Sequence, residues 1–457
     1  MFITNEQKYA YQLLHDAYYG SGLFSLGRGL KQHPRESIDN YNFRKKLSSY
    51  SNHTAAIINA NVDPIFNDEI RREYKETAKF KVFLKDADRL GTSLQEYIQQ
   101  QALIAKMYGV VYVIVNNEAE FGESLADNVR DRRLPYLTSV EPSDVTGWKL
   151  DDKGRIIRFE YRTIVTDDNG GSSTVYYEWT DTKWTIRDKG RGIINEGEHG
   201  LGRVPVVQWF GRSTKKTTIL PHPEFYSLAQ KNYRVYHLDS LLTQILNSQT
   251  FSTLTMPSDE GIEDLTLGVN NVLLYPSEAS HPPAFIAPDN GPAQIIMQEK
   301  EAEIKEMYRI GGVDSVVGVQ QEKSGVAKQW AFKRTNQRLA NFAVQCENAE
   351  KAIIALYELW TGEQLNYKCE YPRDFDINDV ADCLSQGQQA LDLGFKSKTY
   401  YVEVLKRILD GYMPNIDGNV YDAIVKEVEA TAQQEVLDDM YSNGENPDEN
   451  SERSLLA

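Results

Sequence analysis

One arrangement in this sequence is close to a metal-dependent active site. Pro288-Asp289 precedes Glu303-Ile304-Lys305, and many nucleases hold Mg²⁺ with paired carboxylates while a lysine assists the attacking water. That chemistry needs the acid and the lysine on one side, as they are two residues apart on a strand. The run AEIKEMYRI has helical periodicity, on which positions i and i+2 diverge. We keep a nuclease as the minor alternative.

The other catalytic patterns are incomplete. A phosphate-binding motor loop needs Gly-x4-Gly-Lys-Ser/Thr, and the nearest stretch, GLFSLGRG from Gly22 to Gly29, has neither the lysine nor the hydroxyl. The seven histidines show no HExxH spacing, and Cys346, Cys369 and Cys383 form no CxxC pair. We expect no catalytic residue, no metal and no cofactor, and buried thiols in a reduced compartment.

Charge limits the partners that the chain can hold. Its 457 residues include 50 Lys and Arg against 66 Asp and Glu, a net charge of −16. Proteins that wrap nucleic acid are usually basic, so the chain fits a surface past which DNA moves without sticking. No apolar run is long enough for a membrane span, and residues 109–115 (GVVYVIV) suit a buried strand. The first thirty residues include Asp16 and do not have the pattern of a signal peptide, so we expect a cytoplasmic origin.

The segment 322–360 predicts one unusually long helix. After Ser324-Gly325 it has no Gly or Pro up to residue 360, a rod of about 50 Å at 1.5 Å per residue. Its first half carries cations, among them Lys333. Its second half carries an apolar seam, spaced alternately by three and four residues: Leu339, Phe342, Cys346, Ala349, Ile353, Leu356 and Trp360. Such a seam packs against a core, so we expect it to anchor the helix in its own domain.

The stretch before this helix alternates between helical and β-rich regions. Residues 1–130 are mostly helical in pattern, with a helix capped by Ser93 and stopped by Gly109. Residues 135–210 contain short β-rich runs separated by DDKG, DDNGG and DKGRG turns. We interpret them as one antiparallel sheet that ends with VPVVQWF at 204–210. The chain is therefore expected to have an α+β fold.

A second long helix starts at Pro223 and a third returns from a proline-rich excursion. The second helix carries a packing seam: Leu228, Val235, Leu238, Leu242 and Ile245. Six prolines between residues 250 and 292 exclude a single helix there, although NNVLLYP predicts a strand. The run AQIIMQEKEAEIKEMYRI is the returning helix, and glycines mark a loop at 311–325.

Five stretches, taken in order, resemble a known family. They are YNFRKKLSSYSNHTAAIINANVDPIF (41–66), LPYLTSVEPSDVTGWKLDDKGRI (134–156), HGLGRVPVVQWF (199–210), SGVAKQWAF…NQRLANFAVQCENAEKAI from Ser324, and DLGFKSKTYYVEVLKRILDGYMP (392–414). Together they cover most of the chain. They are similar to the portal proteins of tailed bacteriophages, in the family with an SGVA-type motif after its tunnel loop.

The resemblance implies a ring, of twelve copies in this family, at one vertex of a capsid. DNA would enter through the ring, driven by a terminase ATPase, and leave by the same path. The implied partners are double-stranded DNA without sequence specificity, terminase, the major capsid protein and a head-completion or adaptor protein, with no membrane. The implied location is the portal vertex of a virion assembled in the host cytoplasm, and the chain would be no enzyme.

The resemblance also implies a division of the chain into parts. These are a wing at 1–220, helical and then β-rich; stem helices at 221–249 and 293–310 with a clip at 250–292 between them; a tunnel loop at 311–325; a long wing helix and its return at 326–374; a helical crown at 375–440; and a disordered acidic tail at 441–457.

The tunnel loop would contain most of the functional residues. Its expected lining is Val313, Val316, Val317, Val319, Gln320, Gln321 and Lys323. Apolar and weakly polar groups suit sliding, because each phosphate neutralised by a fixed cation adds affinity through counterion release. Ser324 and Gly325 would cap and hinge the long helix, and Lys328 and Lys333 could touch phosphates. The seam of the second helix would pack between neighbouring copies.

A different structural virion protein, or a scaffold protein, remains the main alternative. The helices and the sheet alone would suit such a protein equally well. The geometry of the oligomer distinguishes it from a portal, because a portal must form a ring with a central hole.

Overall fold

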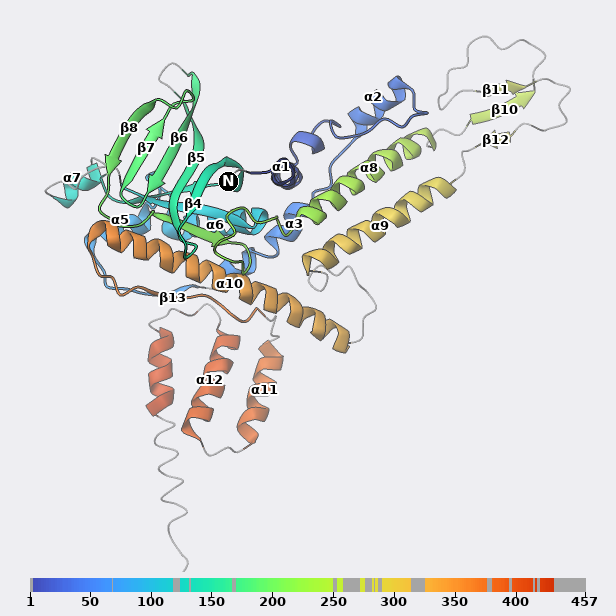
Figure 1. Ribbon diagram of the computed structural model, residues 1–457. Helices are drawn as coiled ribbons and strands as arrows, with labels where there is room; N and C mark the ends of the chain where they lie inside the picture. Colours follow the sequence, from blue (N-terminus) through green and yellow to red (C-terminus); the bar gives the residue numbers. More distant parts are fainter. Residues whose placement is uncertain are drawn as a thin grey trace, which may run out of the picture. The chain divides into compact units, whose positions relative to one another are not determined.

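The structure, a computed structural model, divides into two compact units, one of residues 1–66 and 70–374 and the other of 67–69 and 375–457. The residues that it describes are 3–67, 69–117, 124–130, 133–166, 170–249, 253–257, 272–275, 282, 284–286, 290–313, 325–375, 380–393, 397–413, 416 and 420–430. They form helices and mostly antiparallel sheets (Figure 1), which confirms the predicted α+β class. No helix in these ranges is long and apolar enough to cross a membrane.

The first unit begins with helices that have clear local start and stop signals. The elements are α1 (Asn5–Tyr19), η1 (Gly22–Phe24), α2 (Ile38–Leu47), α3 (His53–Asn59), α4 (Asp63–Asn67), α5 (Ala78–Lys85) and α6 (Leu94–Tyr108). Ser93 caps α6 in a capping box with Glu96, and Gly109 ends it at a φ of 86°. A left-handed backbone of this kind favours glycine. Both predicted ends of this helix are confirmed.

Two sheets lie beside these helices. The first has the order β3-β2-β9, with β2 (Val110–Asn116), β3 (Tyr136–Val140) and β9 (Val206–Phe210), and α7 (Leu125–Arg130) lies between β2 and β3 in the sequence. The second is a five-stranded meander of β4 (Val145–Leu150), β5 (Ile156–Thr166), β6 (Ser172–Thr180), β7 (Lys183–Arg187) and β8 (Ile193–Glu198), with η2 (Pro142–Asp144) before it. The expected single sheet is therefore wrong.

The reason for this correction lies in burial. Strand β2 is buried at every residue, so it needs apolar partners on both edges, and β9 supplies Val206, Val207, Trp209 and Phe210. Strand β8, which precedes β9 in the sequence, is exposed along almost all of its length. The last β-rich run thus leaves the meander and closes the inner sheet, because that is where its apolar side chains can be buried.

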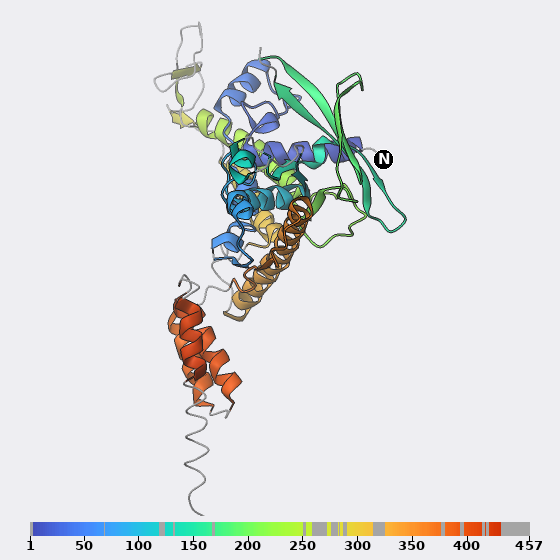
Figure 2. The same ribbon diagram turned by 90° about the vertical axis from the view of Figure 1, so that its left-hand side faces the viewer.

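Two long antiparallel helices pack side by side. The segment of the chain that joins them contains a small sheet. They are α8 (Tyr226–Gln249) and α9 (Gly291–Gly311), seen together in Figure 1 and, from another side, in Figure 2. The sheet has β10 (Thr253–Pro257) in the centre, parallel to β11 (Val272–Tyr275) and antiparallel to β12 (Ala284–Ile286). The strand predicted at NNVLLYP is β11, and most of the rest of 250–292 lies outside the described residues.

The predicted long helix is α10 (Gly325–Thr361), with 37 residues. Six residues of its predicted seam, from Leu339 to Leu356, are buried, and the seventh, Trp360, is half-buried and donates a hydrogen bond to Val115 O at 2.7 Å. After the helix, β13 (Lys368–Glu370) pairs antiparallel with β1 (Arg71–Glu73), from the N-terminal part of the chain. The anchoring role predicted for the seam is confirmed.

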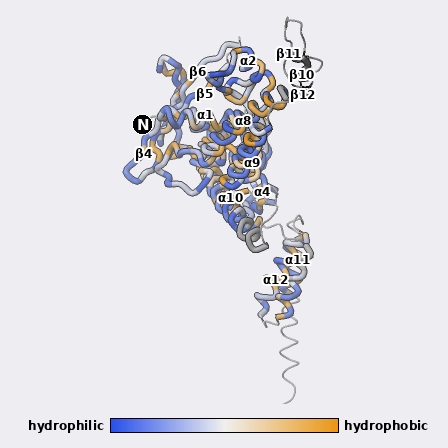
Figure 3. Tube along the Cα trace, turned by 90° about the vertical axis from the view of Figure 1, so that its right-hand side faces the viewer, coloured by the Kyte–Doolittle hydropathy of each residue, from blue (hydrophilic) through white to orange (hydrophobic). Residues whose placement is uncertain are grey.

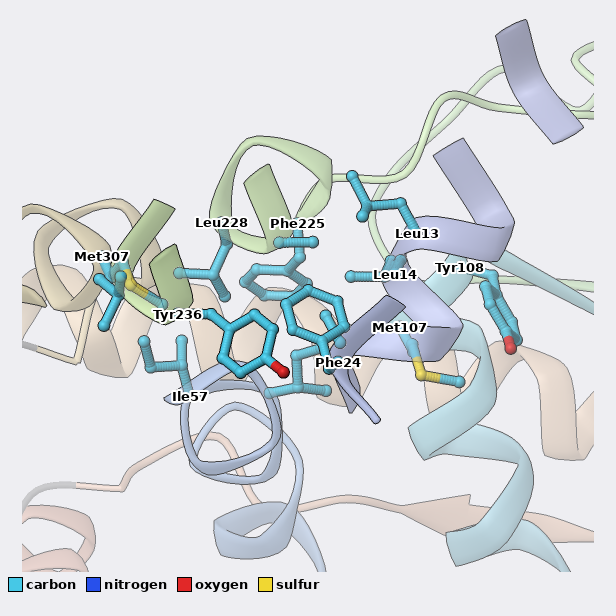
Figure 4. Close-up of a cluster of buried hydrophobic side chains, with 14 of the residues drawn as sticks. Leu13, Leu14, Phe24, Ile57, Met107, Tyr108, Phe225, Leu228, Tyr236 and Met307 are labelled. Atoms are coloured by element: carbon cyan, nitrogen blue, oxygen red, sulfur yellow. The ribbon is translucent and has the colours of Figure 1, made fainter. Parts of the chain in front are cut away.

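The core of the first unit joins helices that are far apart in the sequence. Figure 4 shows side chains from α1, α3, α6, α8 and α9 packed together, including Leu14, Ile57, Met107, Leu228 and Met307. At its centre Asn232 is fully buried and accepts hydrogen bonds from Tyr50 and Thr54. The base of α8 is thus held rigidly in this unit. Figure 3 shows the hydropathy along the trace.

The second unit is helical in the part that the structure describes. It contains α11 (Val380–Asp392), α12 (Lys398–Tyr412) and a helical segment at 420–430. Ser397 caps α12, and Tyr400 on α12 donates a hydrogen bond to Ala390 O at 2.9 Å. The tail expected at 441–457 lies outside the described residues.

Candidate functional site

The two long helices and α10 meet at a polar junction, which is the candidate functional site. Helix α9 ends at Gly312, whose φ of 70° closes the helix in the left-handed conformation. Val313 then donates its backbone N–H to Tyr308 O at 3.2 Å and is buried, with 1% of its surface exposed. The chain thus enters the segment 314–324 from the core.

Helix α10 is hydrogen-bonded to this turn through Thr335 and Arg338. Thr335 donates a hydrogen bond from Oγ1 to Gly312 O at 2.6 Å. Arg338 donates from Nη1 to Ile310 O at 3.1 Å, and so satisfies a carbonyl at the end of α9. A Cβ atom on Gly312 would collide with the Arg338 guanidinium. The helix therefore sits against the turn with no room for another side chain.

Glu224, which lies just before α8, completes the junction. Its Oε1 accepts a hydrogen bond from Arg338 Nη2 at 2.6 Å, and its Oε2 lies 3.2 Å from Lys106 Nζ on α6. Lys106 is only 4% exposed and also reaches Gly211 O at 3.3 Å. One carboxylate thus holds two cations from two different helices, and we call Lys106, Glu224 and Arg338 the junction triad.

The electrostatics of the triad follow from burial. Burial lowers the pKa of the Lys106 ammonium, and Glu224 offsets part of that effect. Burial also opposes the charge on Glu224, but Lys106 and Arg338 together outweigh it, so the pKa of this carboxyl lies below its usual range. A buried charge left alone is costly, so each member of the triad depends on the others.

The triad fixes α10 at Arg338, and this fixed point determines where the first part of the helix lies. The helix is fixed at Thr335 and Arg338, while its first residue, Gly325, lies about 15 Å before Thr335 at 1.5 Å per residue. The segment 314–324 therefore starts at the buried Val313 and ends at the tip of a helix that is held from its middle. Such an arrangement fixes the chain just before the segment, at Val313, and also holds the helix that follows it.

The structure changes the interpretation of several predicted site residues. Val313 belongs to the core and cannot line a tunnel, because the turn at Gly312 points it inward. Gly325 is the first residue of α10. Lys333 is exposed. The remaining predicted residues, or their side chains, lie outside the described part: Val316, Val317, Val319, Gln320, Gln321, Lys323, Ser324 and Lys328.

The predicted seam of α8 separates into two parts. Leu228 and Val235 are fully buried in the core of their own chain, so their expected role between copies is wrong. The periodic pattern does mark a packing face of α8, but the N-terminal part of this face packs against α1, α3 and α9 of the same chain. Leu238, Leu242 and Ile245 are half-buried, and a role for them between copies stays a prediction.

The residues of the junction that the sequence did not single out are Thr335, Lys106 and Glu224. One signal was present: Lys106 interrupts the apolar face of its predicted helix, and a charge in that position requires a partner. Which carboxylate supplies the partner depends on the tertiary fold, because Glu224 lies far from Lys106 in the sequence.

The nuclease-like residues do not form a metal site in the described part of the chain. Glu303 lies on α9 and is 8% exposed, with Lys231 Nζ at 2.7 Å and Arg234 Nε at 3.1 Å. Two cations thus occupy the carboxylate that would bind the metal. Asp289 lies outside the described residues, within which no group of His, Cys, Asp or Glu is arranged for a metal ion.

The two cysteines whose side chains are described, Cys346 and Cys369, are buried and free. Burial raises the pKa of both thiols, to about 12 for Cys369. A thiol with a raised pKa is a poor nucleophile. Trp179 and Trp184, from neighbouring strands, are paired and buried in the sheet.

Comparison with known proteins gives similarities of shape. No family model matches the chain, and no curated protein sequence matches it. A chain from the neck of an empty GTA particle, computed with C6 symmetry, is 10% identical with a TM-score of 0.46, over 82% of this chain and 95% of that one. A chain from the neck of the native GTA particle, computed with C12 symmetry, is 9% identical with a TM-score of 0.43, and the match covers 84% of this chain and 98% of that one. A chain from the virion of the native gene transfer agent (GTA) particle is 9% identical with a TM-score of 0.44, and the match covers 83% of this chain and 97% of that one. Identities this low assign no function.

Proposed function

We propose that this chain is a portal protein of a tailed-phage type of particle, a ring of copies, twelve in the family that it resembles, through which DNA is packaged and ejected. In this proposal α8 and α9 are the stem, the sheet of β10 to β12 is the clip, and 314–324 is the tunnel loop. The chain acts without catalysis, and the terminase supplies the energy for DNA movement.

The observation that carries the proposal is the junction triad. An out-and-back pair of helices is fixed at its base to the middle of a 37-residue helix. The segment between them follows the buried Val313 and precedes Gly325, the first residue of that helix. A protein that must hold a loop steadily against a moving polymer needs fixed points of this kind on either side of the loop.

Charge supports the same function. The chain carries a net charge of −16, and a negative wall repels phosphates. The repulsion acts locally, because screening limits it to about 8 Å at physiological ionic strength. DNA can then move through such a passage without the many phosphate contacts that would hold it in place.

The alternative is another structural virion or scaffold protein, and assembly state separates the two. Purified chain should sediment as one large species and show rings with a central hole in negative stain. A monomer at micromolar concentration would overturn the portal proposal. A solid or filamentous assembly would favour the alternative.

The clip is proposed to bind terminase during packaging and a head-completion protein afterwards. Residues 258–268 lie between β10 and β11, which are parallel, and parallel strands need a long connection. Replacing this stretch by Gly and Ser of equal length therefore tests its surface without removing the connection. We expect intact rings that no longer package DNA. Normal packaging would place the docking surface elsewhere.

A further inference from the structure

A short segment runs back along α10 after the chain leaves that helix, and we call it the strap. It covers residues 365–374 and contains β13, which pairs with β1. Each later contact of the strap falls on an earlier part of α10: Tyr371 meets Glu350, Arg373 meets Glu347 and Ala340, and Asp374 meets Asn336. Figure 1 shows the strap beside α10. The strap is therefore antiparallel to the helix, and its last contact is next to Thr335, which holds the turn at Gly312.

The first half of the strap is held by a buried carboxylate. Glu350 is fully buried and accepts hydrogen bonds from Arg72 Nε at 2.6 Å and from Arg72 Nη2 at 3.1 Å. It also accepts hydrogen bonds from the hydroxyl groups of Tyr367 and Tyr371. These four donors satisfy a charge that burial would otherwise make costly. Detaching the strap here would remove two of the donors, so this half stays on the helix.

The second half of the strap is held by contacts that water reaches. The Arg373 side chain is 43% exposed, pairs with Glu347, and donates from Nη1 to Ala340 O at 3.3 Å. Asn336 Nδ2 donates to Oδ1 of the exposed Asp374 at 2.9 Å. Contacts of this kind are weak because water competes for both partners. This half of the strap can therefore detach from α10 while the first half holds.

The strap is also where the chain passes between the two units. The passages follow Phe66, precede Ile70 and follow Asp374. Phe66 packs edge-on against the Tyr371 ring, with 6.2 Å between the ring centroids. Ile70 leads directly into β1, which pairs with β13. Asp374 is the last residue of the strap. A displacement of the second unit thus reaches the first unit through the strap and its paired strand.

The exposed half of the strap and the turn at Gly312 hold the same part of α10. Asn336 and Ala340 contact the strap, while Thr335 and Arg338 bond to the end of α9. We propose that the strap couples the second unit to the segment 314–324. When the second unit is displaced, the exposed half leaves α10, and the first part of this helix is then held by its contacts with α9 and Glu224. The inference rests on the proposed function, whose tunnel loop it regulates.

Amide hydrogen exchange of the full chain tests the coupling, because it measures local opening. The strap variant is Arg373→Ala with Asp374→Ala, two exposed positions whose folding circular dichroism checks. Exchange at residues 325–338 should rise by about two- to fivefold, the factor that corresponds to an exposed ion pair. Exchange in α6 and at residues 342–356 should stay as in the wild type. A rise that extends over α6 would indicate general loosening and overturn the coupling.

A matched control is Lys368→Ala, which removes the exposed Lys368–Glu73 pair between the two paired strands but no contact with α10. It should leave exchange at 325–338 unchanged, and an equal rise in both variants, or none in the strap variant, would overturn the proposal. Coupling is reciprocal, so Thr335→Val, which removes the hydrogen bond to Gly312 O, should raise exchange at residues 373 and 374. No rise there would also overturn it.

The consequence for DNA is tested by filling proheads that contain these variants. The strap variant should fill more slowly than the wild type, while Lys368→Ala should fill normally. Normal filling by the strap variant, with raised exchange at 325–338, would overturn the regulation of the tunnel loop. A wild-type chain that forms no rings would reject the proposed function while the exchange result stands, so the two failures are distinguishable.

Discussion

Arg338 Nη2, in the middle of α10, lies 2.6 Å from Glu224 Oε1 at the base of the α8–α9 pair, and Glu224 in turn holds the buried Lys106. This contact joins three helices that are remote in sequence. It fixes where the long helix crosses the stem, and so where the segment 314–324 ends.

Replacement of Glu224 tests the triad directly. Glu224→Gln leaves Lys106 buried without a carboxylate, and breaking a buried ion pair on one side costs about 3 kcal/mol. Denaturant unfolding of the first unit should show this loss. Adding Lys106→Met should recover part of it, because the uncompensated charge is removed. Lys351→Ala is the control: it removes the lysine of the Lys351–Glu347 pair, whose side chain is 43% exposed, and should change stability by no more than about 0.5 kcal/mol. Equal effects at both sites would contradict the role of the triad.

Alanine substitutions at two glycines distinguish the stability cost of backbone strain from the cost of displacing Arg338. Gly312 and Gly362 both have a φ of 70°, but a Cβ on Gly362 would meet no atom within 4 Å. Gly362→Ala should therefore cost about 1–2 kcal/mol from the left-handed backbone alone. Gly312→Ala should cost more, because the Arg338 guanidinium must move and lose its hydrogen bonds. Thermal unfolding of the two variants measures the difference, and no difference would mean that the guanidinium is not held in place.

Three histidines, one buried and two half-buried, predict a loss of stability in mild acid. Burial lowers the pKa of His53, His199 and His237 in the folded chain. The unfolded chain therefore binds protons first as the pH falls through about 6.5, and folding loses stability from there down to the folded pKa values. The unfolding midpoint should fall between about pH 7 and about pH 5.

His199→Phe should make this dependence shallower, since the ring lies between Trp179 and Trp360 and a phenyl group fits there. The lowered pKa of Glu36 and Glu224 acts separately, below the usual carboxyl value of 4.5. A midpoint that is flat to about pH 5 would contradict the assignment of the histidines.

Local signals in the sequence were sufficient for individual elements. The alternating spacing from Leu339 to Trp360 predicted the packed half of α10, and Ser93 and Gly109 predicted the limits of α6. A seam shows that a helix packs but not against what. Leu228 and Val235 therefore looked like contacts between copies and are core residues.

Contacts between distant segments could not be predicted from the sequence for the same reason. Arg44 lies among exposed cations and gave no sign that it is buried against Ser240. The pairing of β9 with β2 depends on the burial of β2 on both faces. The partner of Lys106 depends on where α8 starts. Each of these is set by packing between distant segments, which periodicity does not encode.

The last prediction concerns the loop that the triad positions. In the proposed portal, Val316 and Val319 lie in the segment that faces DNA, and apolar groups give phosphates nothing to hold. Val316→Lys with Val319→Lys would add two cations per copy, and each phosphate neutralised by a cation strengthens binding through counterion release. Rings should still form, while DNA filling of proheads that contain them slows or stalls, and higher salt should relieve the effect because it weakens such contacts. Gly325→Pro, at the predicted hinge that begins α10, should stiffen the junction and also impair filling, and higher salt should not relieve that effect. Normal filling with both lysines present would remove this segment from the tunnel, and slow filling that salt does not relieve would assign the defect to structure rather than charge.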